Sequence, residues 1–241
     1  FEMVKHFKNP DISIVGANLV NNEEIGDGIA YQENAFISRE IRMKYQEGLI
    51  WGSVIGAYGA CFAIRNSDFI TVPSNYLVDD FYITMNVLKN RKKVIYELNS
   101  VCYESVPSEL SEEFRRKVRI ATGNFQNLKA YSSLLFGPRL AVSFCFWSHK
   151  VLRWIGPFFI VLTIVSLFFL QHLLIYRIAA ITIAFVLLLP FVDYILRKLN
   201  LHIVILRFAT HFFSMNIALM VGLIKYIKGV KSNVWQPTQR K

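Results

Sequence analysis

The sequence holds few cysteines, and they are not spaced to bind a metal. Only three occur in 241 residues, at positions 61, 102 and 145. Zinc sites usually show cysteine or histidine pairs a few residues apart, and disulfide frameworks belong to oxidising compartments. We therefore expect reduced, partly buried thiols in a cytosolic compartment and no metal site in this chain.

Acidic residues are also scarce. Asp and Glu total 17 against 27 Lys and Arg, which gives a net charge of +10. Such a charge fits nucleic acid, an anionic membrane surface or a phosphate-bearing substrate. No nucleic-acid-binding motif is visible, so we expect no nucleic acid partner. The hydrophobic half favours the membrane, because Lys and Arg collect on the cytoplasmic side of membrane spans.

Charge is nearly absent from three long stretches near the C-terminus. Residues 154–170 and 208–224 contain no Asp, Glu, Lys or Arg, and residues 173–192 contain only Arg177. Each stretch approaches the ~20 residues that cross a bilayer. Residues 1–135 have ordinary soluble composition. The predicted fold class is an α/β domain followed by an α-helical transmembrane region.

The change from ordinary soluble composition to long apolar stretches divides the chain. We expect a catalytic-type domain over 1–137, an interfacial amphipathic helix over 138–153, membrane helices over 154–224 and a basic cytoplasmic tail over 225–241. The basic clusters at 139–153, 197–207 and 225–241 all favour the cytoplasm. Two crossings satisfy the first two clusters, whereas a third would place the tail outside. The sequence therefore predicts that residues 208–224 are interfacial or re-entrant.

Within the first domain, strands and helices alternate. Apolar periodicity predicts a strand over 12–20, a helix over 33–46 that ends at Gly48, a helix that follows Asp79 to Asn90, a strand over 92–98 and a helix capped by Ser108. Small residues, Gly56, Gly59 and Ala60 among them, lie before a short strand that ends at Arg65. They let a backbone approach a ligand closely, or they form a turn into a buried strand.

Two charged groups are candidates for chemistry. Asp79 and Asp80 open a helix, where a carboxylate can be held ionised as a base; the alternative is an acidic helix cap. Arg115, Arg116, Lys117 and Arg119 could hold a diphosphate; the alternative is a solvated basic face paired with Glu112 and Glu113.

The order of these segments resembles the C-terminal part of bacterial family 2 glycosyltransferases, membrane-integrated enzymes related to cellulose, hyaluronan and poly-N-acetylglucosamine synthases. Glu40-Ile-Arg42 and residues 56–65 resemble the acceptor-side segment. Val78-Asp79-Asp80 resembles the Glu-Asp motif, and residues 114–126 resemble the Q-x-x-R-W helix. The tail Trp235-x-Pro-Thr-x-Arg240 is similar to the tail of hyaluronan synthases.

The resemblance implies the acceptor-side half of a GT-A-like domain in an inverting transferase of polysaccharide synthesis at the bacterial inner membrane. It implies a nucleotide-sugar donor, typically a UDP-sugar, and a glycan or lipid-linked acceptor. The implied roles are catalysis by Asp80 with Asp79 beside it, acceptor binding by Gly56, Gly59, Ala60 and Arg65, and diphosphate binding by Arg116, Arg119, Trp235 and Arg240.

Two departures from the family pattern shape these expectations. At the Q-x-x-R-W position the chain has Arg116, Arg119 and Ile120, without the Gln and Trp, which suggests another acceptor or single-sugar transfer. No D-x-D motif occurs, so the ligands of the Mg²⁺ or Mn²⁺ that bridges the diphosphate are expected upstream of Phe1 or in a separate chain. The alternative function is a non-catalytic membrane scaffold or remnant of a split transferase.

Overall fold

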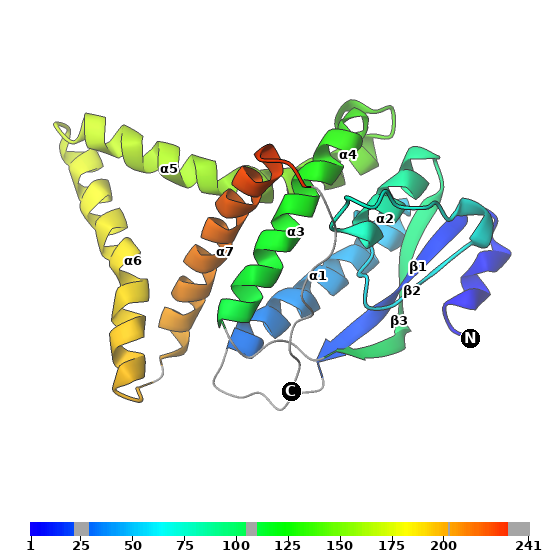
Figure 1. Ribbon diagram of the computed structural model, residues 1–241, viewed down its shortest axis with the longest axis horizontal. Helices are drawn as coiled ribbons and strands as arrows, with labels where there is room; N and C mark the ends of the chain where they lie inside the picture. The colour runs from blue at the N-terminus through cyan, green and yellow to red at the C-terminus, as the bar shows by residue number, and fades with distance from the viewer. Residues whose placement is uncertain (22–28, 105–109, 202, 231–241) are drawn as a thin grey trace.

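The computed structural model describes residues 1–21, 29–104, 110–201 and 203–230. It combines a small mixed sheet and its covering helices with long apolar helices (Figure 1). The elements are β1 (Ile12–Asn21), α1 (Ile29–Trp51), β2 (Phe62–Ile64), α2 (Asp79–Lys89), β3 (Lys93–Glu104), α3 (Leu110–Ala130), α4 (Leu140–Phe146), α5 (Leu152–Leu170), α6 (Leu174–Lys198) and α7 (Val204–Ile227), with short 3₁₀ helices at Val4–Lys8, Asn66–Asp68 and Ser132–Phe136.

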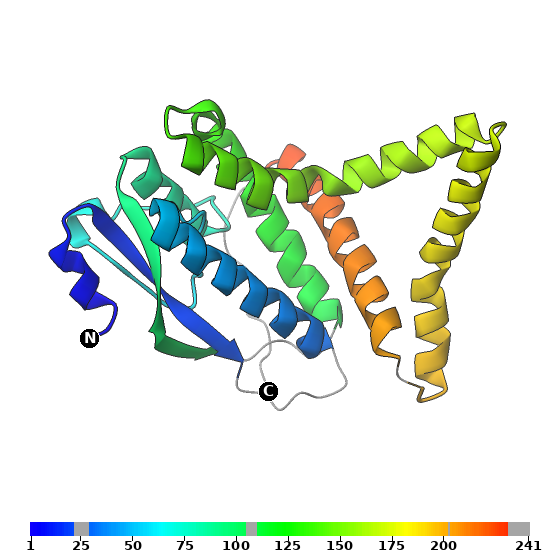
Figure 2. The same cartoon turned by 180° about the vertical axis from the view of Figure 1, so that it is seen from behind.

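The sheet has the order β2-β1-β3, so the first strand lies in the middle. β1 pairs antiparallel with β2 and parallel with β3. A parallel pair needs a crossover, and α1 is part of it, lying across one face of the sheet (Figure 2). β1 is buried on both faces: Ser13, Ile14 and Val15 have no exposed surface.

The expected strands and helices of this domain are present in the described residues, but α1 is longer than predicted at both ends, Ile29–Trp51 against 33–46, and β3 continues to Glu104. Gly48 does not end the helix, which continues to Trp51. A Cβ atom at Gly48 would lie 3.2 Å from the Ile95 Cα, so this glycine serves the close approach of α1 to β3. The helix ends before Gly52, whose φ of +60° suits glycine best. The predicted cap at Ser108 lies outside the described residues.

An aromatic cluster joins the sheet domain to the long apolar helices. The indole of Trp154 in α5 lies 5.8 Å from the ring of Phe81 in α2, 6.4 Å from Phe125 in α3 and 6.1 Å from Phe146 in α4, between ring centroids. Aromatic pairs at such separations contribute beyond the area that they bury. The cluster therefore ties four helices together.

No break separates the predicted interfacial helix 138–153 from the first apolar stretch. α4 and α5 are joined by a π-helical turn, Trp147–Val151, in which the Leu152 N–H donates to the Trp147 carbonyl. The residues from Leu140 to Leu170 thus form one long helix. A π turn inserts an extra residue and frequently marks a functional position.

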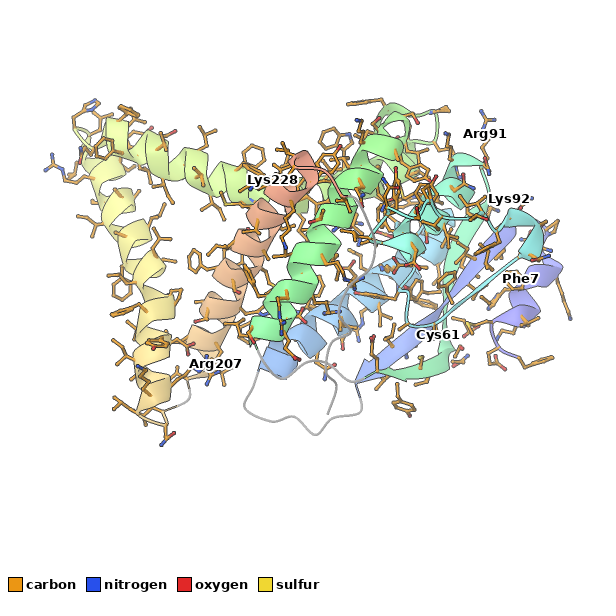
Figure 3. The ribbon with its side chains drawn as sticks, viewed as in Figure 1. Phe7, Cys61, Arg91, Lys92, Arg207 and Lys228 are labelled. Atoms are coloured by element: carbon orange, nitrogen blue, oxygen red, sulfur yellow. The ribbon has the colours of Figure 1, made fainter. Side chains whose placement is uncertain are left out.

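Within the described residues, three helices are long and apolar enough to cross a membrane: Leu140–Leu170, Leu174–Lys198 and Val204–Ile227. α6 exposes apolar side chains all round, and Asp193 is the buried residue of that helix. Its carboxylate lies 3.2 Å from the Nε of Arg207, which Figure 3 labels at the start of α7. Apolar surface on this scale needs lipid or protein around it, which indicates a membrane protein.

α7 does not stand alone. It runs side by side with α3, as Figures 1 and 2 both show. Gly222 allows the contact, because a Cβ there would lie 2.5 Å from the Ala121 Cβ. The Thr122 hydroxyl donates to the Gly222 carbonyl at 3.2 Å, and Tyr226 stacks on Phe125. One side of this apolar helix is therefore covered by a helix rich in charged residues.

Candidate functional site

The two neighbouring aspartates lie in the first turn of α2, as the sequence predicts, but in different environments. Asp79 is exposed, and its Oδ1 accepts the Asp80 N–H at 2.9 Å. The Asp80 carboxylate is partly buried and accepts the Phe81 N–H at 2.7 Å and the Gly59 N–H. Asp80 is thus the more firmly held of the two.

The environment of Asp80 favours a stronger base. Burial raises the pKa of the Asp80 carboxyl above its usual range, and the charge of Asp79 adds to this. The N–H donors of Phe81 and Gly59 and the ammonium of Lys44 act in the opposite direction without cancelling it. A carboxylate with a raised pKa accepts a proton more readily than an ordinary aspartate, provided that it is ionised at the working pH.

The small residues of the preceding loop make room for this helix start. Gly56 has φ of +81°, and a Cβ there would lie 2.6 Å from the Phe81 ring. A Cβ at Gly59 would lie 2.9 Å from the Asp80 Oδ2. Ala60, the next small residue, is exposed. The structure therefore brings Gly56 and Gly59 against α2, and their predicted role in acceptor binding stays a prediction.

Thr84, a buried residue of α2, links the loop at Ala57 to the first turn of α2. Its hydroxyl donates to the Asp80 carbonyl at 2.7 Å and accepts the Ala57 N–H at 3.1 Å. Thr84 and Ala57 are both buried. This bridge fixes the distance between the loop and the Asp80 backbone.

The arginine-rich helix packs beside the aspartates. The Arg119 Nη1 donates to the Leu77 carbonyl at 3.3 Å, just before α2. Burial lowers the pKa of the Arg119 guanidinium, Arg116 adds to the lowering, and the charges of Asp80 and Asp79 oppose it. Gly123 lets α3 approach, since a Cβ there would lie 2.5 Å from the Val78 Cγ2. Arg119 thus lies within electrostatic reach of both carboxylates.

Other residues predicted for binding lie in different settings. Arg116 makes a two-point ion pair with the fully buried Glu113, at 2.8 and 2.9 Å. Arg65 donates to the carbonyls of Phe7, Asn9 and Ile12, and so holds the N-terminal segment to the sheet. Their predicted contacts with diphosphate and acceptor stay predictions. Trp235 and Arg240 lie outside the described residues.

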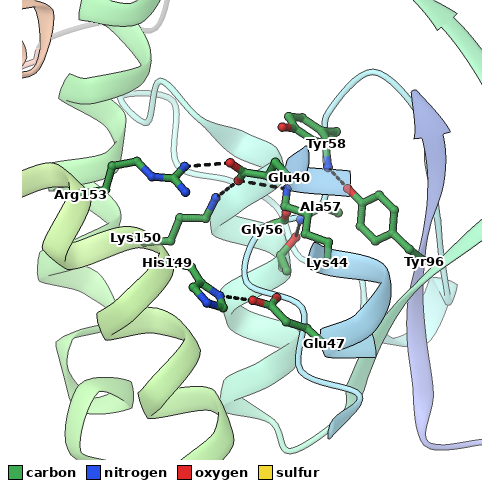
Figure 4. Close-up of polar contacts among 11 residues, drawn as sticks. Glu40, Lys44, Glu47, Gly56, Ala57, Tyr58, Tyr96, His149, Lys150 and Arg153 are labelled. Atoms are coloured by element: carbon green, nitrogen blue, oxygen red, sulfur yellow. Dashed lines mark hydrogen bonds and ion pairs between the residues drawn. The ribbon is translucent and has the colours of Figure 1, made fainter. Parts of the chain in front are cut away.

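The most heavily charged buried site was not predicted from the sequence. Four residues of α1 and the π turn region form what we call the Glu40 cluster: Glu40, Lys44, Lys150 and Arg153 (Figure 4). The Glu40 carboxylate lies 2.5 Å from the Lys150 Nζ, 2.7 Å from an Arg153 nitrogen and 3.8 Å from the Lys44 Nζ. Burial opposes ionisation of Glu40, but the three cations together hold its pKa well below the usual range.

Lys44 connects the Glu40 cluster to the loop that carries Gly56 and Gly59. Its side chain is 3% exposed, and its Nζ donates to the Gly56 carbonyl at 2.6 Å and lies 3.8 Å from the centre of the Tyr58 ring. Burial and the nearby Lys150 lower the pKa of Lys44 to about 7, while Glu40, Asp80 and Glu47 oppose the shift. The Tyr58 N–H in turn donates to the Tyr96 hydroxyl at 2.9 Å. The loop over residues 56–58 is therefore held in place by the buried Lys44 and by the Tyr96 hydroxyl.

Comparison with known proteins adds no family. No protein-family model matches the chain, and no curated protein matches it. The glycosyltransferase resemblance therefore rests on the motif order, and the function has to be argued from the geometry of Asp80 and its surroundings.

Proposed function

We propose that this chain is the acceptor-side and membrane portion of an inverting glycosyltransferase that uses a nucleotide-sugar donor, with Asp80 as its base. The observation that carries the proposal is the single partly buried carboxylate at the start of α2, with its pKa raised by burial, under a glycine loop and beside Arg119. The family resemblance, which assigns the base to Asp80, also supports the proposal.

In the proposed reaction, Asp80 takes the proton of an acceptor hydroxyl as that oxygen attacks the anomeric carbon of the donor sugar. The bond from this carbon to the diphosphate oxygen breaks, and the nucleoside diphosphate leaves. Arg119 offsets the negative charge that develops on the leaving group. Gly56 and Gly59 let the loop lie against the start of α2, because a Cβ at either position would contact Phe81 or Asp80, and the resemblance assigns acceptor binding to this loop.

The family implies Mg²⁺ or Mn²⁺ at the diphosphate, and the described residues around Asp80 do not fit such an ion. The Asp80 carboxylate is engaged by the N–H groups of Phe81 and Gly59, and one oxygen of Asp79 accepts another N–H. A guanidinium lies within reach as well, whereas these hard ions take several oxygen ligands. In the proposal, the donor half supplies the metal ligands from an upstream segment or a separate chain.

The membrane arrangement belongs to the same proposal. The sheet domain faces the cytoplasm, α5 and α6 cross the membrane, and α7 lies partly in the interface against α3. A span surrounded by lipid would not carry a charged helix along one side, which supports the interfacial placement. This arrangement keeps the basic ends of α6 and α7 on the cytoplasmic side.

The test is sugar transfer by membranes that contain the complete enzyme. Asp80→Asn is expected to lower the transfer rate by about 10²–10⁴-fold, the usual contribution of a positioned base. Asp11→Asn is the matched control, because Asp11 is exposed and its carboxylate lies 3.6 Å from Lys93. Near-normal transfer by Asp80→Asn would remove Asp80 as the base. Absence of transfer in every form, including wild type with its donor half, would favour the non-catalytic scaffold.

A further inference from the structure

Three residues with metal-binding side chains meet beneath the Glu40 cluster, at the junction of α1 with the π turn. Glu47 comes from α1, Cys145 from α4 and His149 from the π turn. Their ligand atoms all lie within 4.8 Å of one another. The His149 Nδ1 points at the Glu47 carboxylate and contacts it (Figure 4).

The chemistry of the three ligands is selective. Thiolate, imidazole and carboxylate together suit Zn²⁺ and its neighbours in the first transition row, whereas Mg²⁺ and Ca²⁺ take oxygen ligands. Cys145 is fully buried, and the Glu47 side chain is 5% exposed. His149 is the most accessible of the three, at 24% side-chain exposure, and so offers an entry path.

Burial of these groups makes a metal energetically sensible. A carboxylate and a thiolate away from water need two positive charges nearby, and a dication supplies both. Without an ion, the Glu47 carboxylate contacts the His149 ring, and its charge favours that of the more distant Lys44. A dication bound by one thiolate, one carboxylate and one neutral imidazole gives a site without net charge, which suits this buried position.

A fourth polar group, the Ser53 hydroxyl, lies beside the three candidate ligands. The Ser53 hydroxyl is fully buried and borders the Cys145 thiol, and among the described residues it has no hydrogen-bond partner of normal geometry. A water on a three-coordinate ion would reach such a hydroxyl and complete the four ligands that zinc prefers. The Ser53 hydroxyl can therefore form a hydrogen bond with a water that occupies the fourth ligand position of the ion.

The distances need little adjustment. Tetrahedral zinc bonds of ~2.0–2.3 Å place ligand atoms roughly 3.3–3.8 Å apart. Because the ligand atoms all lie within 4.8 Å of one another, their separations would close by at most about 1 Å, and the His149–Glu47 contact would open to admit the ion. Side-chain rotations accomplish both changes, and the extra residue of the π turn already directs His149 toward α1.

We propose that Glu47, Cys145 and His149 bind one zinc-class transition-metal ion, which fastens α1 of the sheet domain to the first apolar helix. The site is independent of the proposed sugar transfer, because none of its ligands contacts Asp80. The role of this site is to hold α1 against the π turn, and the Glu40 cluster spans the same junction. The alternative occupant of the same space is a Glu47–His149 ion pair beside a buried thiol.

The test begins with the full protein in detergent, purified with a tag that contains no histidine. Elemental analysis is expected to find about one zinc per chain. After removal of the metal with a chelator, Co²⁺ is expected to bind and to give a thiolate-to-cobalt charge-transfer band. Cys145→Ser is expected to abolish that band, and His149→Gln to weaken Co²⁺ binding at least about tenfold.

The matched controls are Cys61→Ser and His172→Gln, which change residues of the same types outside the cluster and should keep full binding. The wild-type cobalt spectrum decides the matter even if Cys145→Ser does not fold. Less than about a tenth of an ion per chain together with no charge-transfer band would overturn the proposal and leave the ion pair. A band that persists in folded Cys145→Ser would also overturn it.

Discussion

Glu40→Gln tests the Glu40 cluster by removing one charge and almost no volume. The carboxylate is 4% exposed and faces three cations, of which Lys44 is 3%, Lys150 13% and Arg153 41% exposed. Breaking a buried ion pair from one side typically costs 3–5 kcal/mol. Because Arg153 can turn to water and Gln still accepts a hydrogen bond, we expect about 3 kcal/mol.

A loss of this size is measurable. For a chain of this length, about 2–4 °C in melting temperature corresponds to each kcal/mol, so the midpoint should fall by roughly 6–12 °C. The assay is thermal unfolding of the detergent-solubilised protein, followed by fluorescence of its tryptophans. Glu2→Gln is the matched control, because the Glu2 and Lys5 side chains are 44% and 36% exposed and pairs so open to water contribute little.

The pH dependence sharpens this prediction. The pKa of Lys44 is lowered to about 7 in the folded protein, so folding gains stability from this group as pH rises from 7 toward its ordinary value of 10.5. Below pH 7 Lys44 is charged and needs Glu40. The deficit of Glu40→Gln should therefore be larger at pH 6 than at pH 9, and Lys44→Met should recover part of it. A Glu40→Gln midpoint equal to that of Glu2→Gln would refute the buried-charge account.

Three other predictions concern the Asp80 region and the helix contact. Arg119→Ala should weaken nucleoside diphosphate binding about tenfold, measured by calorimetry, because one charge-assisted contact is lost. Arg115 is exposed, and Arg115→Ala should leave the affinity unchanged. Equal affinities of Arg119→Ala and wild type would make Arg119 a structural residue. Because burial raises the pKa of Asp80, transfer should fall on acidification at a higher pH than an ordinary aspartate gives, and a pH–rate profile without such a limb would contradict this. Gly222→Ala should destabilise the α3–α7 contact by about 1–3 kcal/mol in thermal unfolding, whereas Gly156→Ala, with open space around it, should not; a neutral Gly222→Ala would show that the helices can separate freely.

Local signals in the sequence were sufficient to place the helix start at Asp79 and its neighbours. Acidic residues at the positive end of a helix are stabilising and readable without a structure. The approach of Arg119 and Gly123 to this turn was not predicted, since residues forty apart in sequence carry no periodic signal for each other. The structure supplies the cause, which is that Gly123 lets α3 pack on Val78.

Gly48 shows why a local rule can fail. Glycine is a frequent helix stop because it adopts left-handed conformations, and the sequence alone favoured that interpretation. The position instead needs a residue without a side chain inside the helix, at 3.2 Å from the β3 backbone. Tertiary packing decided the role of the glycine, and propensity could not anticipate it.

The buried charges were missed for a similar reason. Glu40 and Lys44 are four residues apart, a spacing that reads equally well as an exposed ion pair on a helix surface. Their burial depends on Lys150 and Arg153, more than one hundred residues later. Cys145 and His149 share a four-residue spacing that could have suggested a metal ligand pair, but Glu47 is joined to them only by the fold.

The central claim, that Asp80 is the base of a sugar transfer, is tested most directly by measuring donor binding and turnover on one preparation of the complete enzyme. For Asp80→Asn we predict a nucleotide-sugar dissociation constant within about twofold of wild type and a kcat about 10²–10⁴-fold lower. Because burial disfavours the ionised carboxyl, the neutral Asn should fold at least as stably, so lost activity would not reflect unfolding. A kcat close to wild type with intact donor binding would contradict the account.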